Sequence, residues 1–258
     1  MNFYPIKVFV KRLSLSLGLY RPARFLNDLI TRRSRRGILE QDIKLYSDLL
    51  PNGVLCFDVG ANIGEKTDAM LRSGMRVLAI EPQPTCVAEL NARCGKDPNL
   101  TIVQTAIGAE VGDAELFISD AYHASSSLKV GWTSSSSSIT VPVTTLDVLI
   151  ERYGLPHYCK IDVEGFEMEV LKGLTNPIPL ISLEYHLNEA EIKKASDCIG
   201  YISKLANGDI RLNLTPAEVN VFEFNDWLTE QEFWSKFPDT IIERQGFKYG
   251  DIWVKSCI

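Results

Sequence analysis

A glycine-containing turn follows the apolar run 54–59 and precedes a segment with helical spacing. A strand, a tight turn and a helix N-terminus in this order expose backbone N–H groups to which a ligand can bind. Gly60 and Gly64 lack a Cβ atom, so they allow the backbone a close approach that a side chain would block. Asp58 would repel a pyrophosphate, but it suits a ligand that carries ammonium and sulfonium charges. The segment therefore predicts a ligand site made by Asp58, Gly60, Asn62 and Gly64.

The next apolar run, 76–81, ends in a second acid. In open α/β folds a carboxylate about 20 residues beyond the glycine turn binds the hydroxyls of an unphosphorylated ribose, and we expect Glu81 to do so. The dinucleotide fingerprint G-x-G-x-x-G is absent, which disfavours a nicotinamide cofactor. A purely structural alternative stays open, in which both glycines serve a tight turn and Asp58 caps the following helix. That alternative leaves Glu81 without a role.

Two later apolar runs carry charged side chains in alternation. Because side chains alternate between the two faces of a strand, Lys160, Asp162 and Glu164 should share one face. Glu184 and His186 repeat this pattern in the following run. Unpaired charges are costly to bury, but they suit the carboxyl ends of parallel strands, where ligands bind. We therefore expect these five residues to form a catalytic cluster above the sheet. A structural network of lysine and carboxylates stays open as the alternative.

Apolar runs alternate with segments of helical spacing through the rest of the chain. This alternation predicts an α/β fold with a doubly wound, mostly parallel sheet and helices on both faces. The expected strands are 54–59, 76–81, 100–107, 158–163, 180–186 and 248–255, and the expected helices are 64–73, 84–95, 146–153, 166–174 and 188–205. Two shorter runs, 114–119 and 139–145, indicate extra strands around a serine-rich loop, 124–138, which we interpret as a flexible lid.

Composition is typical of a soluble globular protein. No apolar run approaches the roughly 18–20 residues that a membrane span needs. The six cysteines are scattered and form no C-x-x-C pair. This pattern favours reduced thiols over a disulfide framework or a zinc site. We therefore expect a cytoplasmic protein and no structural metal.

The charge of the chain is unevenly distributed. Residues 1–37 contain nine Lys/Arg and one acid, whereas the rest of the chain contains 18 basic and 32 acidic residues. An acidic body argues against broad contact with a nucleic-acid backbone. We expect a basic, helical N-terminal arm over 1–50 and one domain over 51–258. The arm is expected to pack on its own acidic domain, and peripheral contact with an anionic membrane surface stays open.

Several motifs together resemble the FkbM-like family of methyltransferases. They are F-D-V-G-A-N-I-G-E (57–65), A-I-E-P-Q-P (79–84), T-L-D-V-L-I (145–150), K-I-D-V-E-G-F-E-M-E-V-L-K-G (160–173) and S-L-E-Y-H (182–186). The resemblance implies a Rossmann-like class I methyltransferase fold and S-adenosylmethionine as the methyl donor. It also implies that the transfer is usually to oxygen. The resemblance leaves the acceptor open, and we expect a hydroxyl of a sugar, glycan or secondary metabolite. We expect the adenine of the donor near Gln104 and Ala106.

A methyl transfer to a hydroxyl requires positioning of two reactants and removal of one proton. The candidate bases are His186, whose unperturbed pKa is near neutral, and Asp162 or Glu164. His123, beside the serine-rich loop, is a weaker candidate. Carboxylates at the ends of adjacent strands would also suit magnesium, which lowers the pKa of a bound hydroxyl. Because Lys160 could already neutralise that charge, we favour chemistry without a metal.

Two other functions stay open at this point. One is an NAD-dependent oxidoreductase or epimerase on a related fold, which the missing glycine fingerprint and the missing Tyr-x-x-x-Lys helix disfavour. The other is a module that binds S-adenosylmethionine without catalysis. Binding of S-adenosylmethionine or NAD separates the two enzyme classes, and turnover of a labelled methyl group separates an enzyme from a module.

Overall fold

The computed structural model describes residues 36–118, 127–128, 137–186, 188–217, 219–243 and 249–257. The chain divides into two compact units, Met1–Glu40 and Gln41–Ile258. The described part of the first unit, 36–40, is helical, and most of the expected basic arm lies outside the described residues. In the part of the chain that the structure describes, no helix is long and apolar enough to cross a membrane.

The second unit begins at Gln41, ten residues before the boundary that we expected at residue 51. Residues 41–49 are helical and their inner side chains are buried in this unit. Asp42 accepts a hydrogen bond from Lys66 Nζ at 2.6 Å. The ring of Tyr46 packs against those of Tyr158 and Trp253. These contacts tie residues 41–49 to the domain.

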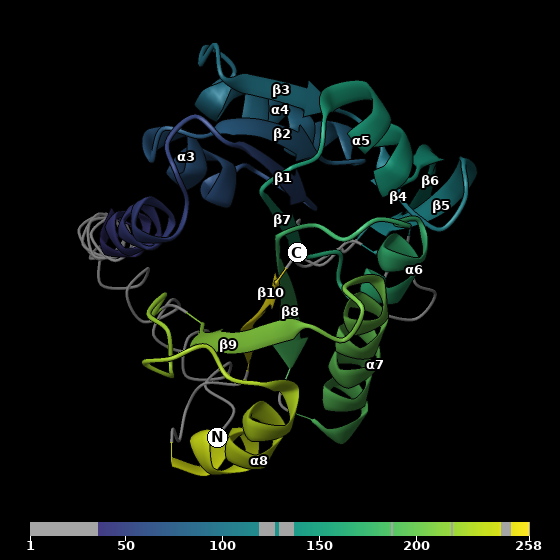
Figure 1. Cartoon of the computed structure of the whole chain (residues 1–258). Coiled ribbons are helices and arrows are strands. Elements are labelled where there is room, and N and C mark those ends of the chain that lie inside the picture. Colours follow the sequence, from purple (N-terminus) through teal and green to yellow (C-terminus); the bar gives the residue numbers. More distant parts are fainter. Residues whose placement is uncertain are drawn as a thin grey trace, which may run out of the picture. The chain divides into compact units, whose positions relative to one another are not determined.

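A seven-stranded sheet forms the centre of the second unit (Figure 1). Its strand order is β3-β2-β1-β7-β8-β10-β9, and β10 alone runs antiparallel to its two neighbours. The strands are β1 (Leu55–Val59), β2 (Arg76–Ile80), β3 (Leu100–Val103), β7 (Tyr158–Ile161), β8 (Leu180–His186), β9 (Ile210–Pro216) and β10 (Tyr249–Ser256). The pairing of β1 with β7 brings the glycine turn beside the charged motif about 100 residues later.

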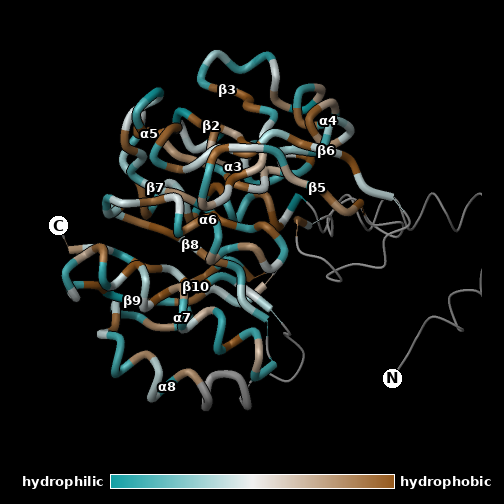
Figure 2. Tube along the Cα trace, turned by 90° about the vertical axis from the view of Figure 1, so that its right-hand side faces the viewer, coloured by the Kyte–Doolittle hydropathy of each residue, from teal (hydrophilic) through white to brown (hydrophobic). Residues whose placement is uncertain are grey.

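Helices cover both faces of this sheet, as a doubly wound fold requires. They are α3 (Glu65–Arg72), α4 (Pro84–Cys94), α5 (Leu146–Tyr153), α6 (Glu167–Lys172), α7 (Glu189–Leu205) and α8 (Glu230–Glu243). Thr145 and Asn188 begin α5 and α7, since each side chain accepts a hydrogen bond from the first turn. Figure 2 shows hydrophobic residues concentrated along β7 and β8 and alternating with hydrophilic ones along α7. The doubly wound, mostly parallel α/β prediction is confirmed.

The two faces of the sheet differ in chemistry. Phe57, Cys159 and Ile181 point into an apolar core that also contains residues of α5, α6, α7 and α8. On the strands β1 and β7 their neighbours Asp58 and Lys160 point to the opposite face, where both are buried. Burying charge requires compensation, so this face carries polar contacts beneath the carboxyl ends of the strands.

Three sequence predictions of secondary structure need correction. The run 100–107 is two strands, β3 and β4 (Ala106–Ile107), and β4 belongs to a separate sheet with the order β4-β6-β5. Its partners, β5 (Gly112–Ile118) and β6 (Ser137–Thr144), are the two extra strands. Residues 137–138, expected in the serine-rich loop, therefore belong to β6. β9 (Ile210–Pro216) and α8 (Glu230–Glu243) were missed, although Ile210, Leu212 and Leu214 of β9 alternate with polar residues as in a strand.

Candidate active site

The turn after β1 brings two distant segments of backbone together. Gly60 has a φ of 80°, and its N–H donates to the carbonyl of Ile80 at 3.0 Å. A Cβ atom on Gly60 would lie 1.8 Å from the carbonyl oxygen of Asp162, and one on Gly64 would lie 2.6 Å from Leu90 Cδ1. Gly60 is therefore required by a backbone contact within the protein, whereas Gly64 is favoured mainly by its φ of 80°. The sequence predicted close approach at these positions, but it assigned that approach to a ligand.

A cavity of about 520 Å³ opens at the carboxyl ends of the parallel strands. Eight of the predicted site residues line it: Gly60, Asn62, Glu81, Ala106, Asp162, Glu164, Glu184 and His186. The other four, Asp58, Gly64, Gln104 and Lys160, are not part of its lining among the described residues. Gln104 is exposed, and the neighbouring Thr105 lines the wall in its place.

The lining also contains residues that the sequence did not single out. Ser127 and Leu128 come from the predicted lid, and Phe166 and Tyr249 lie on the side of the charged cluster. The rest of the lid and His123 lie outside the described residues, apart from the part that belongs to β6. Tyr249 begins β10 opposite His186 on β8. No motif marks Tyr249, because only the antiparallel register of these two strands places it at the cavity.

Glu81 and Asn62 form one wall of the cavity. The Glu81 carboxylate accepts hydrogen bonds from two backbone N–H groups, that of Asn62 at 2.8 Å and that of Gln83 at 2.9 Å. Each carboxylate oxygen keeps further acceptor capacity, which two hydroxyls of one ribose could use. Asn62 Oδ1 is buried and has no hydrogen-bond partner among the described residues. A buried acceptor without a partner is rare, so this wall fits a ligand that donates hydrogen bonds.

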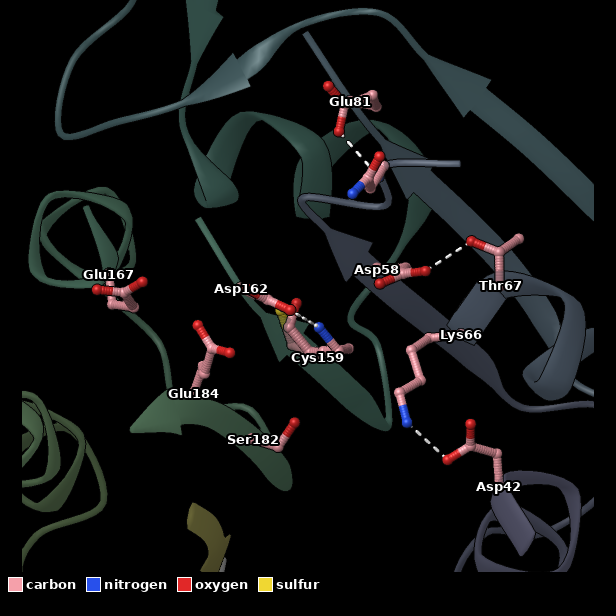
Figure 3. Close-up of polar contacts among 12 residues, drawn as sticks. Asp42, Asp58, Lys66, Thr67, Glu81, Cys159, Asp162, Glu167, Ser182 and Glu184 are labelled. Atoms are coloured by element: carbon pink, nitrogen blue, oxygen red, sulfur yellow. Dashed lines mark hydrogen bonds and ion pairs between the residues drawn. The ribbon is translucent and has the colours of Figure 1, made fainter. Parts of the chain in front are cut away.

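Asp58 lies behind the cavity wall. Its carboxylate is buried and accepts a hydrogen bond from Thr67 Oγ1 at 2.6 Å, so it orders the start of α3 (Figure 3). Burial raises the pKa of Asp58, and the nearby Lys160 ammonium opposes that rise. Direct contact between Asp58 and a ligand, which the sequence suggested, is not supported by this position. Asp58 can still act through its negative charge.

Lys160 joins a buried ionic network below the cavity. Its Nζ donates to Asp162 Oδ2 at 2.6 Å, and the Asp162 side chain is 31% exposed at the cavity wall. Burial alone would lower the pKa of Lys160, but three carboxylates outweigh this effect and raise the pKa above its ordinary value. These carboxylates belong to Asp162, Asp251 and Asp58. Lys160 therefore holds Asp162 from below and does not line the cavity.

Glu164, Glu184 and His186 form a second cluster, the Glu–Glu–His cluster, on the cavity wall. One ligand atom from each lies within 4.8 Å of the others, and His186 Nε2 lies 3.2 Å from Glu184 Oε2. Burial and the nearby charge of Asp162 raise the pKa of Glu184 to about 7. The hydrogen bond to Glu184 raises the pKa of His186.

The backbone conformation that places Glu164 in this cluster is not the strand that side-chain alternation predicted. β7 ends at Ile161, and Glu164 lies in the turn that follows, with a φ of 53°. The expected common strand face for Lys160, Asp162 and Glu164 is therefore wrong at its third member. A left-handed turn, and not the strand, directs Glu164 toward Glu184 and His186.

Known proteins resemble this chain in sequence and in fold. The model of the methyltransferase FkbM domain matches residues 58–249, which is most of the chain. The chain belongs to the FkbM methyltransferase family. This membership confirms the class I, Rossmann-like methyltransferase fold and S-adenosylmethionine as the methyl donor. It also disfavours the NAD-dependent alternative.

Single proteins that resemble this FkbM family member share only part of its sequence. It is 31% identical over 154 residues to the hexuronic acid methyltransferase AglP of Haloferax volcanii, and the match covers 58% of this chain and 62% of AglP, less than two thirds of either. The precorrin-6Y C5,15-methyltransferase of Geobacter metallireducens is similar with a TM-score of 0.45 and 10% identity, covering 83% of this chain and 86% of that one. The plantazolicin methyltransferase BpumL, solved in complex with SAH, is similar with a TM-score of 0.43 and 10% identity. The match covers 97% of this chain and 96% of BpumL.

Proposed function

We propose that this protein transfers the methyl group of S-adenosylmethionine to a hydroxyl oxygen of a sugar or glycan. The observation that carries the proposal is that one cavity joins the Glu81–Asn62 wall to Asp162 and the Glu–Glu–His cluster. Such a cavity can hold donor and acceptor side by side, and holding two reactants in the reacting geometry can lower the barrier by about 7–11 kcal/mol. The relative AglP, a hexuronic acid methyltransferase by name, supports a sugar as the acceptor.

The Glu81–Asn62 wall is the proposed donor end. Glu81 would accept hydrogen bonds from the ribose hydroxyls, and Asn62 Oδ1 would accept one from a donor N–H or O–H group of the same ligand. Ala106 and Thr105 provide a small, mostly apolar surface for the adenine. When bound, S-adenosylmethionine supplies an electrophilic methyl carbon whose bond to sulfur breaks as a bond to the acceptor oxygen forms.

The other end of the cavity is proposed to bind the acceptor. Asp162 stands between the two ends at the cavity wall, where the hydrogen bond from Lys160 holds its carboxylate in place. We infer that Asp162 orients the acceptor hydroxyl and accepts its proton as the carbon–oxygen bond forms. Tyr249, 41% exposed, offers an aromatic face beside His186, with 5.9 Å between the ring centroids. Such a face can pack against the apolar side of a sugar ring.

The Glu81→Ala substitution is expected to weaken binding of S-adenosylmethionine by about 1–3 kcal/mol, because it removes the acceptor for polar groups that are buried with the ligand. Isothermal titration calorimetry measures this change. Glu89→Ala, which removes an exposed glutamate of α4, is the matched control and should bind the donor normally. Equal donor affinity in Glu81→Ala and in the wild type would remove the main support for the donor end.

The proposed reaction can be tested on a panel of model acceptors. We expect transfer of a labelled methyl group from S-adenosylmethionine to members of a set of p-nitrophenyl glycosides and glycan fragments. Mass spectrometry of the product should place the methyl group on a hydroxyl oxygen. Tight donor binding without transfer to any sugar would overturn the proposal and favour a binding module or another class of acceptor.

A further inference from the structure

The Glu–Glu–His cluster has the composition and spacing of a metal site. Two carboxylates and one imidazole come from the turn after β7 and from the end of β8, and they converge on one side of the cavity. Their ligand atoms lie within 4.8 Å of one another, so small rotations of the side chains bring all three to bonding distance of one ion. The open side of the cluster faces the cavity, where a bound acceptor could complete the coordination.

The charge of the cavity agrees with a cation at this cluster. Five acids line it, namely Glu65, Glu81, Asp162, Glu164 and Glu184, while no lysine or arginine occurs among the described lining residues. The sequence disfavoured a metal because Lys160 could neutralise these charges. The structure restricts that effect, since Lys160 is buried below the cavity and its Nζ bonds to Asp162. The acidic wall therefore favours a cation that enters from the cavity itself.

We propose that Glu164, Glu184 and His186 bind a divalent transition-metal ion, such as Mn²⁺, at the acceptor end of the cavity. This inference rests on the proposed function and adds a cofactor to it. The two carboxylate ligands suit manganese, and the imidazole ligand disfavours magnesium, which binds through oxygen ligands and retained waters. The ion would lower the pKa of the acceptor hydroxyl. The hydroxyl proton passes to Asp162, the methyl carbon–sulfur bond breaks and the carbon–oxygen bond forms, with no change of oxidation state.

Titration of the metal-free full-length protein with Mn²⁺ tests this site directly. Calorimetry should find one ion per chain, and Mn²⁺ should bind at least about tenfold more tightly than Mg²⁺. Glu164→Gln and His186→Gln should each weaken Mn²⁺ binding by at least about tenfold, since loss of even a residue that only supports a ligand costs about 10–100-fold. Glu189→Gln removes an exposed glutamate of α7 outside the cavity and should bind Mn²⁺ as the wild type does.

The outcomes separate this inference from the proposed function. Each variant is first shown to bind S-adenosylmethionine, which demonstrates an intact donor end, and either ligand variant suffices if the other does not fold. Absence of Mn²⁺ binding to the wild type, or equal affinity in wild type and ligand variants, overturns the metal site. Site-specific Mn²⁺ binding without transfer to any sugar leaves the metal site standing and overturns the sugar methyltransferase.

Discussion

Replacement of Asp162 by asparagine is expected to lower the rate of methyl transfer by about 10²–10⁴-fold, the usual contribution of a positioned general base. The amide keeps the size of the side chain but cannot accept a proton from the acceptor hydroxyl. The fold should remain nearly as stable, because Lys160 keeps two other carboxylates nearby, those of Asp58 and Asp251. Single-turnover transfer of a labelled methyl group measures the rate, and urea denaturation measures the free energy of unfolding.

The control for this experiment is Asp209→Asn. Asp209 forms an exposed ion pair with Arg211 at 3.0 Å, so its replacement makes the same chemical change away from the cavity. This variant should keep both rate and stability. If Asp162 is only a structural residue, Asp162→Asn should lower the free energy of unfolding by about 3–5 kcal/mol, as when one partner of a buried ion pair is removed. Full turnover of this variant at low temperature would then exclude Asp162 from the reaction.

The largest expected effect on stability is that of Lys160→Met. Methionine fills a similar volume, but it leaves the carboxylates of Asp58, Asp162 and Asp251, of which Asp58 is fully buried, without their central cation. Breaking a buried ion pair in this way costs about 3–5 kcal/mol, a large fraction of the total stability of a domain. Lys172→Met is the matched control, because Lys172 forms an exposed pair with Glu169 and should cost less than about 1 kcal/mol. Equal urea midpoints for the two variants would contradict the buried network.

The pH dependence of Lys160→Met provides a second test. Burial raises the pKa of Asp58 and of Asp251, and in both residues the charge of Lys160 opposes that rise. Without Lys160 these pKa values rise further, so the folded state binds more protons than the unfolded state above the ordinary pKa of aspartate. Stability then falls as the pH rises and returns as the pH falls through the raised pKa values. The stability deficit of Lys160→Met should therefore shrink as the pH falls from neutral toward the ordinary pKa of aspartate, and a deficit independent of pH would show that packing alone is lost.

The sequence by itself determined the fold class and most of the candidate site. Periodic apolar runs specify strands and helices, because each element must bury one face, and the alternation of the two specifies a parallel sheet. The carboxyl ends of parallel strands meet at one edge, so acids at those ends, such as Glu81 and Asp162, could be expected to share a cavity. These inferences need only local pattern and general topology. The identity of the methyl donor, S-adenosylmethionine, followed from the resemblance of the sequence motifs to the FkbM-like family.

Only the tertiary structure decided how the individual side chains are used. The 1.8 Å approach of a Gly60 Cβ to the Asp162 carbonyl depends on the pairing of β1 with β7, which joins residues about 100 positions apart. The left-handed turn at Glu164 directs that side chain to Glu184 and His186, although the strand ends three residues earlier. Tyr249 reaches the cavity only through the antiparallel register of β10 with β8. Strand pairing and burial depend on segments that lie far apart in the chain, so the pattern of residue types within one segment does not specify them.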